Sequence, residues 1–444
     1  MKKILSLSLF LFLSLGLSAQ TINLEQARLL ALANSRTLVR HEIEIRNSVL
    51  SERDQLYNML PQISAGYRAE MSFLRDWEFI NPVDTLTGSV NLTLTQIIFQ
   101  GGKGFLERSI RSINTESARK EALAAYFNEL DTIDNAYYTV LEAGAALEAE
   151  ESSLQAANLS LSIAEIRIAN GMINQGDYLR ALADKESREN SRNQAQRNLT
   201  LNLNRFRNLL GIRDAVYPEP ISFDVYEDVF QRLAGISDDD AEALYEKFWN
   251  LLTASNPSIA IASLNSRRAQ LNHSSIARDY APTISARVSS DILEYSRADG
   301  FNSNPGSNGR ITISGTIPID FWVLSDRVER SRTNRDFTLR DYAYTESSME
   351  QDLLTALSNL FTQAGSVLSS RRSLEYTERH YEYVLERFRL LQSSVSEMND
   401  ASGLLINSRN SNNRASYAFL QSLSRLRSLC AINDEEKLLG ILLN

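Results

Sequence analysis

Three histidines are the residues of this chain best suited to acid–base or metal chemistry. His41, His273 and His380 lie far apart in the sequence, and none has a second ligand at a metal-site spacing. His41-Glu42 starts like the helical zinc-protease motif, but the second histidine of that motif is missing. The histidines therefore predict no metal centre.

The glycine-rich stretch Phe99-Gln-Gly-Gly-Lys-Gly104 has only part of the pattern of a phosphate-binding loop. Gly104 stands where that loop needs Ser or Thr, and Ile97 replaces its upstream glycine. We interpret these glycines as a turn between a strand and a helix. Cys430 is the only cysteine, so no intramolecular disulfide is expected, and its apolar helical context predicts an inert core position. The sequence thus predicts no catalytic residue, no cofactor and no enzyme.

Two carboxylates follow the turn at the end of a long predicted helix. Glu397 and Asp400 are three residues apart, so both lie on one helix face. Asp177 and Arg180 occupy the corresponding places earlier in the chain. Each residue taken alone is equally compatible with an ordinary solvated surface.

The N-terminus predicts export from the cytoplasm. Lys2 and Lys3, an apolar run and the small-residue site Leu17-Ser18-Ala19 predict a signal peptide over residues 1–19. The run is shorter than the roughly 20 residues of a membrane-crossing helix, and no later stretch reaches that length and apolarity. Any passage through a membrane must therefore use a closed β-barrel. The formal charge of −9 becomes two units more negative without the signal, which disfavours nucleic-acid binding.

Four segments alternate strictly between apolar and polar residues, in two pairs. Residues 62–73 and 90–95 form the first pair, and residues 284–292 and 311–317 form the second. Period-two alternation predicts strands with one wet face, and about 10 such residues cross a bilayer when tilted. An ordinary sandwich sheet is the alternative. We expect the polar face to line a barrel lumen, with the charged residues Arg68, Glu70, Arg287 and Asp291.

The surroundings of these strands fit a membrane sheet. The loops 76–88 and 297–309 are polar and rich in turn-forming residues. Aromatic residues near the strand ends are expected to form an interfacial girdle; they are Trp77, Phe79, Tyr280, Phe321 and Trp322.

The chain is an internal duplication with a period of about 220 residues. The segment 57–64 returns as 280–285, and the segment 206–212 returns as 426–432. Each copy is predicted to contain a first helix, two strands, a very long helix and a return helix. The first helix covers 22–57 in the first copy, where Asn23 caps it. In the second copy it covers 243–278, where Pro257 kinks or breaks it. Heptad spacing in the long helices indicates coiled-coil packing. The predicted divisions are a first repeat (20–212), a connector (213–240), a second repeat (241–432) and a C-terminal tail (433–444).

Four strands are too few to close a membrane barrel, because the smallest single-chain barrels have about eight. An open sheet in lipid leaves unpaired backbone groups at both edges, each costing several kcal/mol. We therefore expect strands of other copies to complete the barrel, although this argument does not choose between two copies and three.

These features together resemble the TolC family of outer-membrane efflux and secretion channels, over essentially the whole mature chain. The resemblance rests on the duplicated Pro-x-Ile-Ser strand entry, on Leu92-Thr-Leu-Thr-Gln-Ile-Ile-Phe99 before Gly101-Gly102, on the long helices and on Leu209-Leu210-Gly211-Ile212. It implies a mainly α fold: long coiled-coil helices form a periplasmic α-barrel tunnel, and each chain gives four strands to a trimeric 12-stranded barrel.

The resemblance also implies a function and a site. The chain would be the exit duct of a tripartite efflux or type I secretion system in the outer membrane, with outer-membrane lipid around it. Its partners would be two further copies, a periplasmic adaptor and an inner-membrane transporter of RND or ABC type. The pore constriction would involve Asp177, Arg180, Glu397 and Asp400, with Arg180 a possible partner for either acid of the second copy. The adaptor-docking tip would include Gly171, Gly176, Ser394 and Ser396. The main alternative is a soluble periplasmic coiled-coil adaptor or structural protein.

Overall fold

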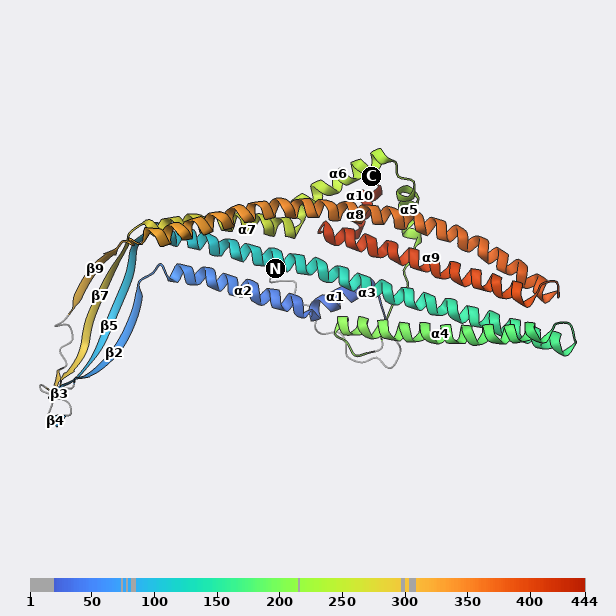
Figure 1. The fold of residues 1–444 in the computed structure, drawn as a ribbon, viewed down its shortest axis with the longest axis horizontal. Coiled ribbons are helices and arrows are strands. Elements are labelled where there is room, and N and C mark those ends of the chain that lie inside the picture. Colours follow the sequence, from blue (N-terminus) through green and yellow to red (C-terminus); the bar gives the residue numbers. More distant parts are fainter. Residues whose placement is uncertain are drawn as a thin grey trace. The chain divides into compact units, whose positions relative to one another are not determined.

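The computed structural model describes residues 20–72, 75–76, 79–80, 85–214, 216–296, 300–302 and 309–443 (Figure 1). The predicted signal peptide, Trp77 and the side chain of Phe79 lie outside these residues. So do parts of the two predicted loops, namely residues 78 and 81–84 of the first and residues 297–299 and 303–308 of the second. The chain divides into two compact units. We call them the helical unit (Met1–Arg36, Ala125–Ser255 and Gln351–Asn444) and the strand unit (Thr37–Ala124 and Asn256–Glu350).

The strand unit contains one antiparallel sheet built from both repeats. Its main strands are β2 (Gln62–Ser72), β5 (Thr85–Gln100), β7 (Thr283–Ser296) and β9 (Arg310–Thr316), in the order β2-β5-β7-β9. The short strand β8 (Gly300–Asn302) extends the pairing with β7, and β3 (Arg75–Asp76) pairs with β4 (Phe79–Ile80). The two predicted hairpins are present, and the pairing of β5 with β7 joins them into one sheet.

The register sorts this sheet into one polar and one apolar face. Arg68 pairs with Ser89, Asn91 with Asp291, and Thr95 with Arg287. Since directly paired residues lie on the same face, one face carries Ser64, Arg68, Glu70, Ser89, Asn91, Thr93, Thr95, Arg287, Ser289, Asp291, Arg310, Thr312 and Ser314. The other face carries Ile63, Ala65, Tyr67, Val90, Leu92, Leu94, Ala286, Val288, Ile311 and Ile313. The alternation read from the sequence is therefore confirmed as a two-faced sheet.

Both faces of the sheet are open to solvent in the single chain. Ile63 is 69% exposed, Tyr67 76% and Ile311 75%. Among the described residues, β2 and β9 each pair with only one neighbouring strand of the sheet. A sheet with an exposed apolar face and two open edges needs covering by other molecules.

Glycines make the turn from β5 into the helix α3 (Lys103–Ala169), as the sequence predicted. Gly101 and Gly102 have φ angles of +59° and +74°, which favour glycine. A Cβ on Gly101 would lie 2.7 Å from Ala281 Cβ. Across this turn, Lys103 Nζ lies 2.8 Å from Asp279 Oδ1. The contact between Gly101 and Ala281 and the ion pair between Lys103 and Asp279 thus hold the turn where β5 ends and α3 begins.

The strand unit also contains α2 (Arg36–Tyr57), α7 (Pro257–Ala277) and the first part of α8 (Phe321–Arg389). Asn256 caps α7 through hydrogen bonds from the Ser258 and Ile259 amides, and Pro257 occupies its first turn. The break predicted at Pro257 is confirmed, because α6 (Asp238–Ser255) ends just before it. Tyr280 stacks on Phe321 with ring centroids 6.3 Å apart.

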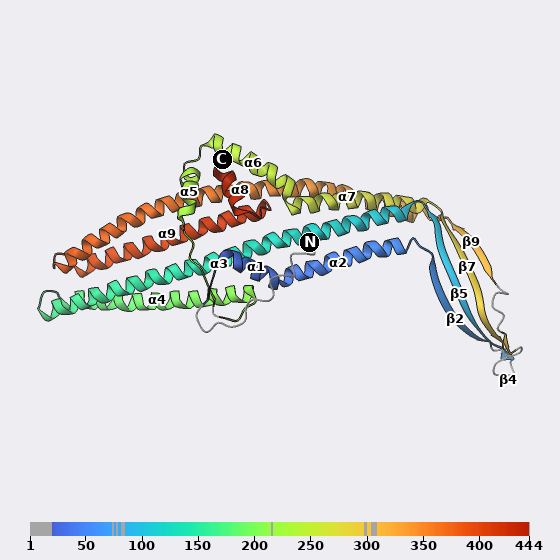
Figure 2. The same cartoon turned by 180° about the vertical axis from the view of Figure 1, so that it is seen from behind.

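Two long antiparallel hairpins dominate the helical unit. The later part of α3 pairs with α4 (Gln175–Leu210), and the later part of α8 pairs with α9 (Val395–Leu429), as both views show (Figures 1 and 2). The helices α3 and α8 have 67 and 69 residues, which confirms the prediction of very long helices. Among the described residues, no helix is both long and apolar enough to cross a membrane.

The two ends of the chain and the connector pack together in the helical unit. β1 (Gln20–Ile22) pairs in parallel with β6 (Val216–Pro218), and Tyr137 Oη donates to Glu219 O at 2.7 Å. The connector also forms a short 3-10 turn, η1 (Asp224–Tyr226), and α5 (Glu227–Ala234). The predicted C-terminal tail is a helix, α10 (Glu435–Leu443), with Leu438 and Leu442 fully buried.

A buried carboxylate ties these segments to the long helices. Asp134 of α3 is fully buried and accepts from Arg28 Nε at 2.7 Å, from Arg427 Nη2 at 2.6 Å and from Ser424 Oγ at 2.9 Å. Arg28 belongs to α1 (Leu24–Asn34), and Glu435 of α10 lies within 4 Å of both arginines. This network joins both chain ends to α3 and α9.

The boundaries of the first helix differ from the prediction. One helix was expected over 22–57, but α1 ends at Asn34, and Ser35 has an extended backbone before α2 begins. Asn34 Nδ2 donates to Leu210 O at 2.8 Å, so a contact with the end of α4 accompanies the break. The cap at Asn23 is confirmed, with a reciprocal bond to Gln26. The order of helix, two strands, long helix and return helix occurs twice, while the exact repeat boundaries stay a prediction.

Candidate functional site

The ends of the two long hairpins are built alike, and they hold the residues predicted to form a constriction. We define the hairpin ends as residues 164–181 and 384–401. In the first, Gly171 has φ +71°, its amide donates to Ile168 O, and the Met172 amide donates to Arg167 O. This is a Schellman motif, which closes a helix with a left-handed residue.

The second hairpin end repeats this motif without a glycine. Leu391 has φ +65°, its amide donates to Phe388 O, and the Gln392 amide donates to Arg387 O at 2.8 Å. Because a left-handed conformation is strained for a residue with a Cβ, the second end stores strain that the first avoids. Leu391 is 56% exposed, so burial does little to offset that strain.

Each return helix then starts with a side-chain cap. Asn174 Oδ1 accepts from the Asp177 amide at 2.9 Å, and Ser394 Oγ accepts from the Glu397 amide at 3.1 Å. Asp177 and Glu397 therefore sit in the first turn of α4 and α9, where the helix dipole favours a negative charge.

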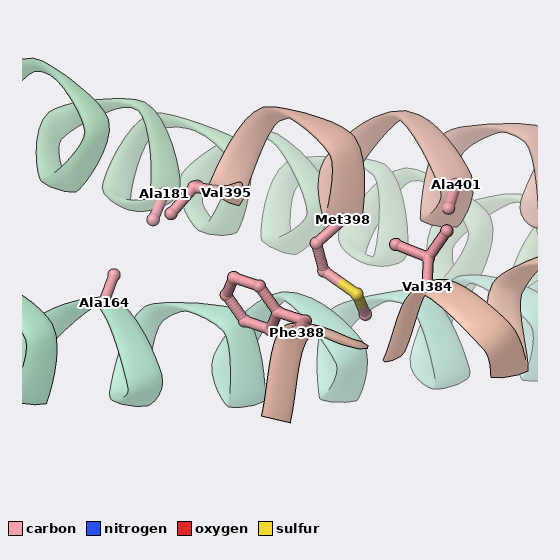
Figure 3. Packing of buried hydrophobic residues seen from close by; sticks show 7 residues of the cluster. All are labelled: Ala164, Ala181, Val384, Phe388, Val395, Met398 and Ala401. Carbon is pink, nitrogen blue, oxygen red and sulfur yellow. The ribbon is translucent and has the colours of Figure 1, made fainter. Parts of the chain in front are cut away.

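A small apolar core lies between the two hairpin ends. It draws side chains from all four long helices (Figure 3), namely Ala164, Ala181, Val384, Phe388, Val395, Met398 and Ala401. Phe388 is fully buried at its centre. The fully buried members from α3 and α4 are alanines, and the partly buried Leu161, Ile163 and Ile173 of the first hairpin pack around them.

Arg167 makes the polar link across this core. Its side chain is buried, Nη1 donates to Ser393 O at 3.0 Å, and Nη2 donates to Phe388 O. The guanidinium also lies 4.3 Å from the centroid of the Phe388 ring. Burial lowers the pKa of Arg167, but an arginine stays charged at neutral pH. One side chain of the first hairpin thus satisfies main-chain oxygens in the turn of the second.

The counterpart of Arg167 in the second repeat makes different bonds. Arg387 Nη1 donates to Glu397 Oε1 at 3.1 Å, and Nη2 donates to Gln392 O at 2.9 Å. Ser393 Oγ donates to Glu397 Oε2 at 2.7 Å. These bonds lower the pKa of Glu397, with Ser393 as the larger cause, so the carboxylate is ionised at neutral pH.

The residues predicted for the constriction and the docking tip all lie at these ends. Asp400 and Arg180 are exposed, whereas Glu397 is half-buried. In the described single chain Glu397 pairs with Arg387 rather than with Arg180. Gly171 and Ser394 hold the turn and cap positions described above, and Gly176 and Ser396 lie in the first turns of α4 and α9. Their roles in constriction and docking stay predictions.

Sequence reasoning missed Arg167. The available signal was its separation from Arg387 by the repeat period, which marks the same position at the end of each long helix. Its partners are carbonyl oxygens more than 220 residues away, which no local pattern reveals.

The predicted lumen residues form a separate set in the strand unit. Arg68, Glu70, Arg287 and Asp291 share the polar face of the sheet. Arg287 also pairs with Thr312 of β9. No group of three or more His, Cys, Asp or Glu residues suited to a metal ion occurs in the part of the chain that the structure describes. Cys430 is fully buried, and burial raises the pKa of its thiol to about 12.

Comparison with known proteins shows what this chain and its fold resemble. Residues 27–212 match the model of the outer membrane efflux protein family. The resemblance to outer-membrane channels read from the sequence is thus confirmed, and the mainly α fold and outer-membrane location expected from it agree with this match. The expectation that the chain is not an enzyme agrees with it too. No curated protein sequence matches the chain significantly.

Solved structures extend the likeness over almost the whole chain. The Campylobacter jejuni CmeC outer membrane channel shares 16% identity and a TM-score of 0.77, covering 95% of this chain and 89% of that one. The Vibrio cholerae outer membrane protein VceC shares 17% identity and a TM-score of 0.74, covering 91% and 95%. The open state of the Neisseria gonorrhoeae MtrE outer membrane channel shares 16% identity and a TM-score of 0.73, covering 92% and 88%. At such low identity these structures establish the fold alone.

Proposed function

We propose that this chain is the passive exit duct of a tripartite efflux or type I secretion system. Three copies join their sheets into one closed ring in the outer membrane, and their helical units form a tunnel in the periplasm. A periplasmic adaptor, working with an inner-membrane transporter of RND or ABC type, docks at the hairpin ends and separates them. The chain itself consumes no nucleotide.

The two-faced sheet is the observation that carries this proposal. Its apolar face is widely exposed, its polar face collects the charged and hydroxyl side chains, and its edges β2 and β9 are free to pair with other copies. Lipid on one side and water on the other satisfy both faces, and pairing between copies satisfies the edges. A soluble adaptor would expose the same apolar side chains to water.

The hairpin ends supply the gating part of the proposal. A small apolar core and the Arg167 link join the first hairpin to the second. A link made by one side chain to two carbonyl oxygens has two discrete states, made or broken, as a gate requires. The ionised Glu397 and the exposed Asp400 contribute negative charge to this region, which favours cations.

Fractionation and conductance measurements test the proposal. The full chain should stay with outer membranes through high-salt washing and form discrete channels in planar bilayers. Arg287→Glu should shift ion selectivity towards cations, because Arg287 lies on the polar face. Arg372→Glu, an exposed residue of the helical unit, is the matched charge reversal and should shift selectivity less. Release of the chain by salt, with no channels, would favour the soluble adaptor.

The predicted constriction needs its own measurement. Replacement of Glu397 and Asp400 together by Ala should raise or alter single-channel conductance, because two carboxylates per copy are removed. Unchanged conductance and selectivity would refute their gating role while leaving the channel proposal intact.

A further inference from the structure

A cavity of about 450 Å³ lies within the helical unit between α3, α8 and α9. One wall is a face of α3 with small side chains, Ala149, Ser152, Ser153 and Ala156. The opposite walls are Tyr381 and Leu385 of α8 and Leu405 and Ile406 of α9, with Glu378, Glu382, Ser402 and Arg409 completing the lining. The volume falls in the range of about 300–1,000 Å³ that is usual for small-ligand sites.

The α3 wall of this cavity holds an unsatisfied hydroxyl. Ser153 is 5% exposed, and its Oγ has no hydrogen-bond partner among the described residues. Its neighbour Ser152 differs, because the Ser152 hydroxyl donates to Glu148 O at 3.0 Å. A buried hydroxyl without a partner costs about 1–3 kcal/mol, and such groups point to an unseen water, ion or ligand.

Two more unpaired acceptors lie on the same helices, outside the lining of the cavity. Glu150 lies one helical turn before Ser153 on α3, and Asn410 lies on α9; they meet through a long contact of 3.5 Å from Asn410 Nδ2 to Glu150 Oε1. Their remaining oxygens, Glu150 Oε2 and Asn410 Oδ1, are buried and have no partner in the described part of the chain. Of these unpaired atoms, only Ser153 Oγ belongs to a residue that lines the cavity, and its hydroxyl oxygen can accept a hydrogen bond from a donor.

The charges around the cavity indicate that the donating group of a ligand is positively charged. Glu378 is paired with Arg409, whose Nη2 lies 3.3 Å from Glu378 Oε1. Glu382 adds a second carboxylate to the lining, against the single cation Arg409. The excess of negative charge favours a cationic head, and the alanine and leucine walls favour an apolar body.

We propose that this cavity binds small amphiphiles that carry a primary ammonium group. The ammonium donates to Ser153 Oγ and to the neighbouring carboxylates, and the alkyl part lies against Ala156, Leu385 and Ile406. Because α3 belongs to the first hairpin and α8 and α9 to the second, the bound molecule bridges the two hairpins. The binding itself does not depend on the channel function proposed above.

Three probes with the same apolar body separate charge from simple hydrophobic uptake. Calorimetric titration of the full chain in lipid nanodiscs uses n-hexylammonium, n-hexanol and n-hexanoate, each corrected with empty nanodiscs. We expect saturable binding of n-hexylammonium, with the neutral and anionic probes about tenfold weaker or more. Equal binding of all three probes would overturn the proposal.

Paired variants locate the site. Ser153→Ala should weaken n-hexylammonium binding about tenfold, whereas Ser152→Ala should change it little, because the Ser152 hydroxyl is already bonded to its own helix. Ala156→Leu should remove binding by filling the cavity. The thermal unfolding of each variant is recorded to confirm that it is folded. If the leucine at position 156 disturbs the fold, Ser153→Ala alone still tests the site. Wild-type affinity in both Ser153→Ala and Ala156→Leu would show that the ligand binds elsewhere, which refutes the site. Loss of binding with normal conductance in either variant would leave the channel proposal untouched.

Discussion

Arg167→Met is the most direct test of the link between the hairpin ends. Methionine keeps an unbranched apolar chain against Phe388 but removes both donors and the charge. Hydrogen bonds from a charged donor contribute about 1.5–3 kcal/mol each, and the cation–π contact adds about 1 kcal/mol. The buried Arg167 Nε has no partner among the described residues, which offsets about 1–3 kcal/mol of this gain. The net contribution is about 3 kcal/mol.

This energy predicts a large change in gating. A difference of about 3 kcal/mol corresponds to roughly a 150-fold shift between joined and separated hairpins. Single-channel recording of Arg167→Met in planar bilayers should show a much larger open fraction than wild type. Arg387→Met is the matched comparison and should raise the open fraction less, since Arg387 occupies the same place in the second repeat but bonds only within its own hairpin. An open fraction that is unchanged in Arg167→Met, or raised equally in Arg387→Met, would refute the role of Arg167.

Three further outcomes are expected. Ser393, and to a lesser degree Arg387, holds the pKa of Glu397 below its usual 4.5. The stability that these contacts give the hairpin end is therefore complete above pH 4.5 and is lost as the pH falls through the lowered pKa. Conductance should rise in that acid window in wild type but not in Glu397→Gln. Gly211→Ala should lower the melting temperature more than Gly171→Ala. Both glycines have φ +71°, but only a Cβ at position 211 would meet neighbouring atoms, at 3.0 Å. Equal effects would show that backbone strain alone matters. Asp134→Ala should destabilise the fold by about 3–5 kcal/mol in thermal or denaturant unfolding, since the buried Arg427 and the half-buried Arg28 lose their common acceptor. A loss below about 1 kcal/mol would contradict this reasoning.

The features that sequence could predict are those determined by neighbouring residues. Alternation along a strand has period two, so Arg68 and Glu70 were assigned to one face before any pairing was known. Pro257 cannot continue a helix from the preceding turn, and Gly101 and Gly102 permit a turn that other residues resist. Such signals need no knowledge of the rest of the chain.

The features that sequence missed depend on distant partners. The break at Ser35 accompanies the bond from Asn34 to Leu210 O, and β1 and β6 are three-residue strands that are stable only as a pair. Arg167 was passed over because an arginine in the last turn of a helix is common, and its carbonyl partners carry no side-chain signal. The helix α10 could have been predicted from the sequence, since Leu438 and Leu442 are four residues apart and so lie on one helix face.

The network at Asp134 has a consequence for biosynthesis. Arg28 and Asp134 leave the ribosome some 290 residues or more before Ser424, Arg427 and Glu435. Until those residues arrive, the carboxylate would be buried with only one of its two cations, so the helical unit cannot reach its final packing during translation or export. A polypeptide cut short before Ser424 therefore remains incompletely packed, a recognisable target for periplasmic proteases. Resistance to proteolysis therefore requires that the chain be synthesised through Glu435.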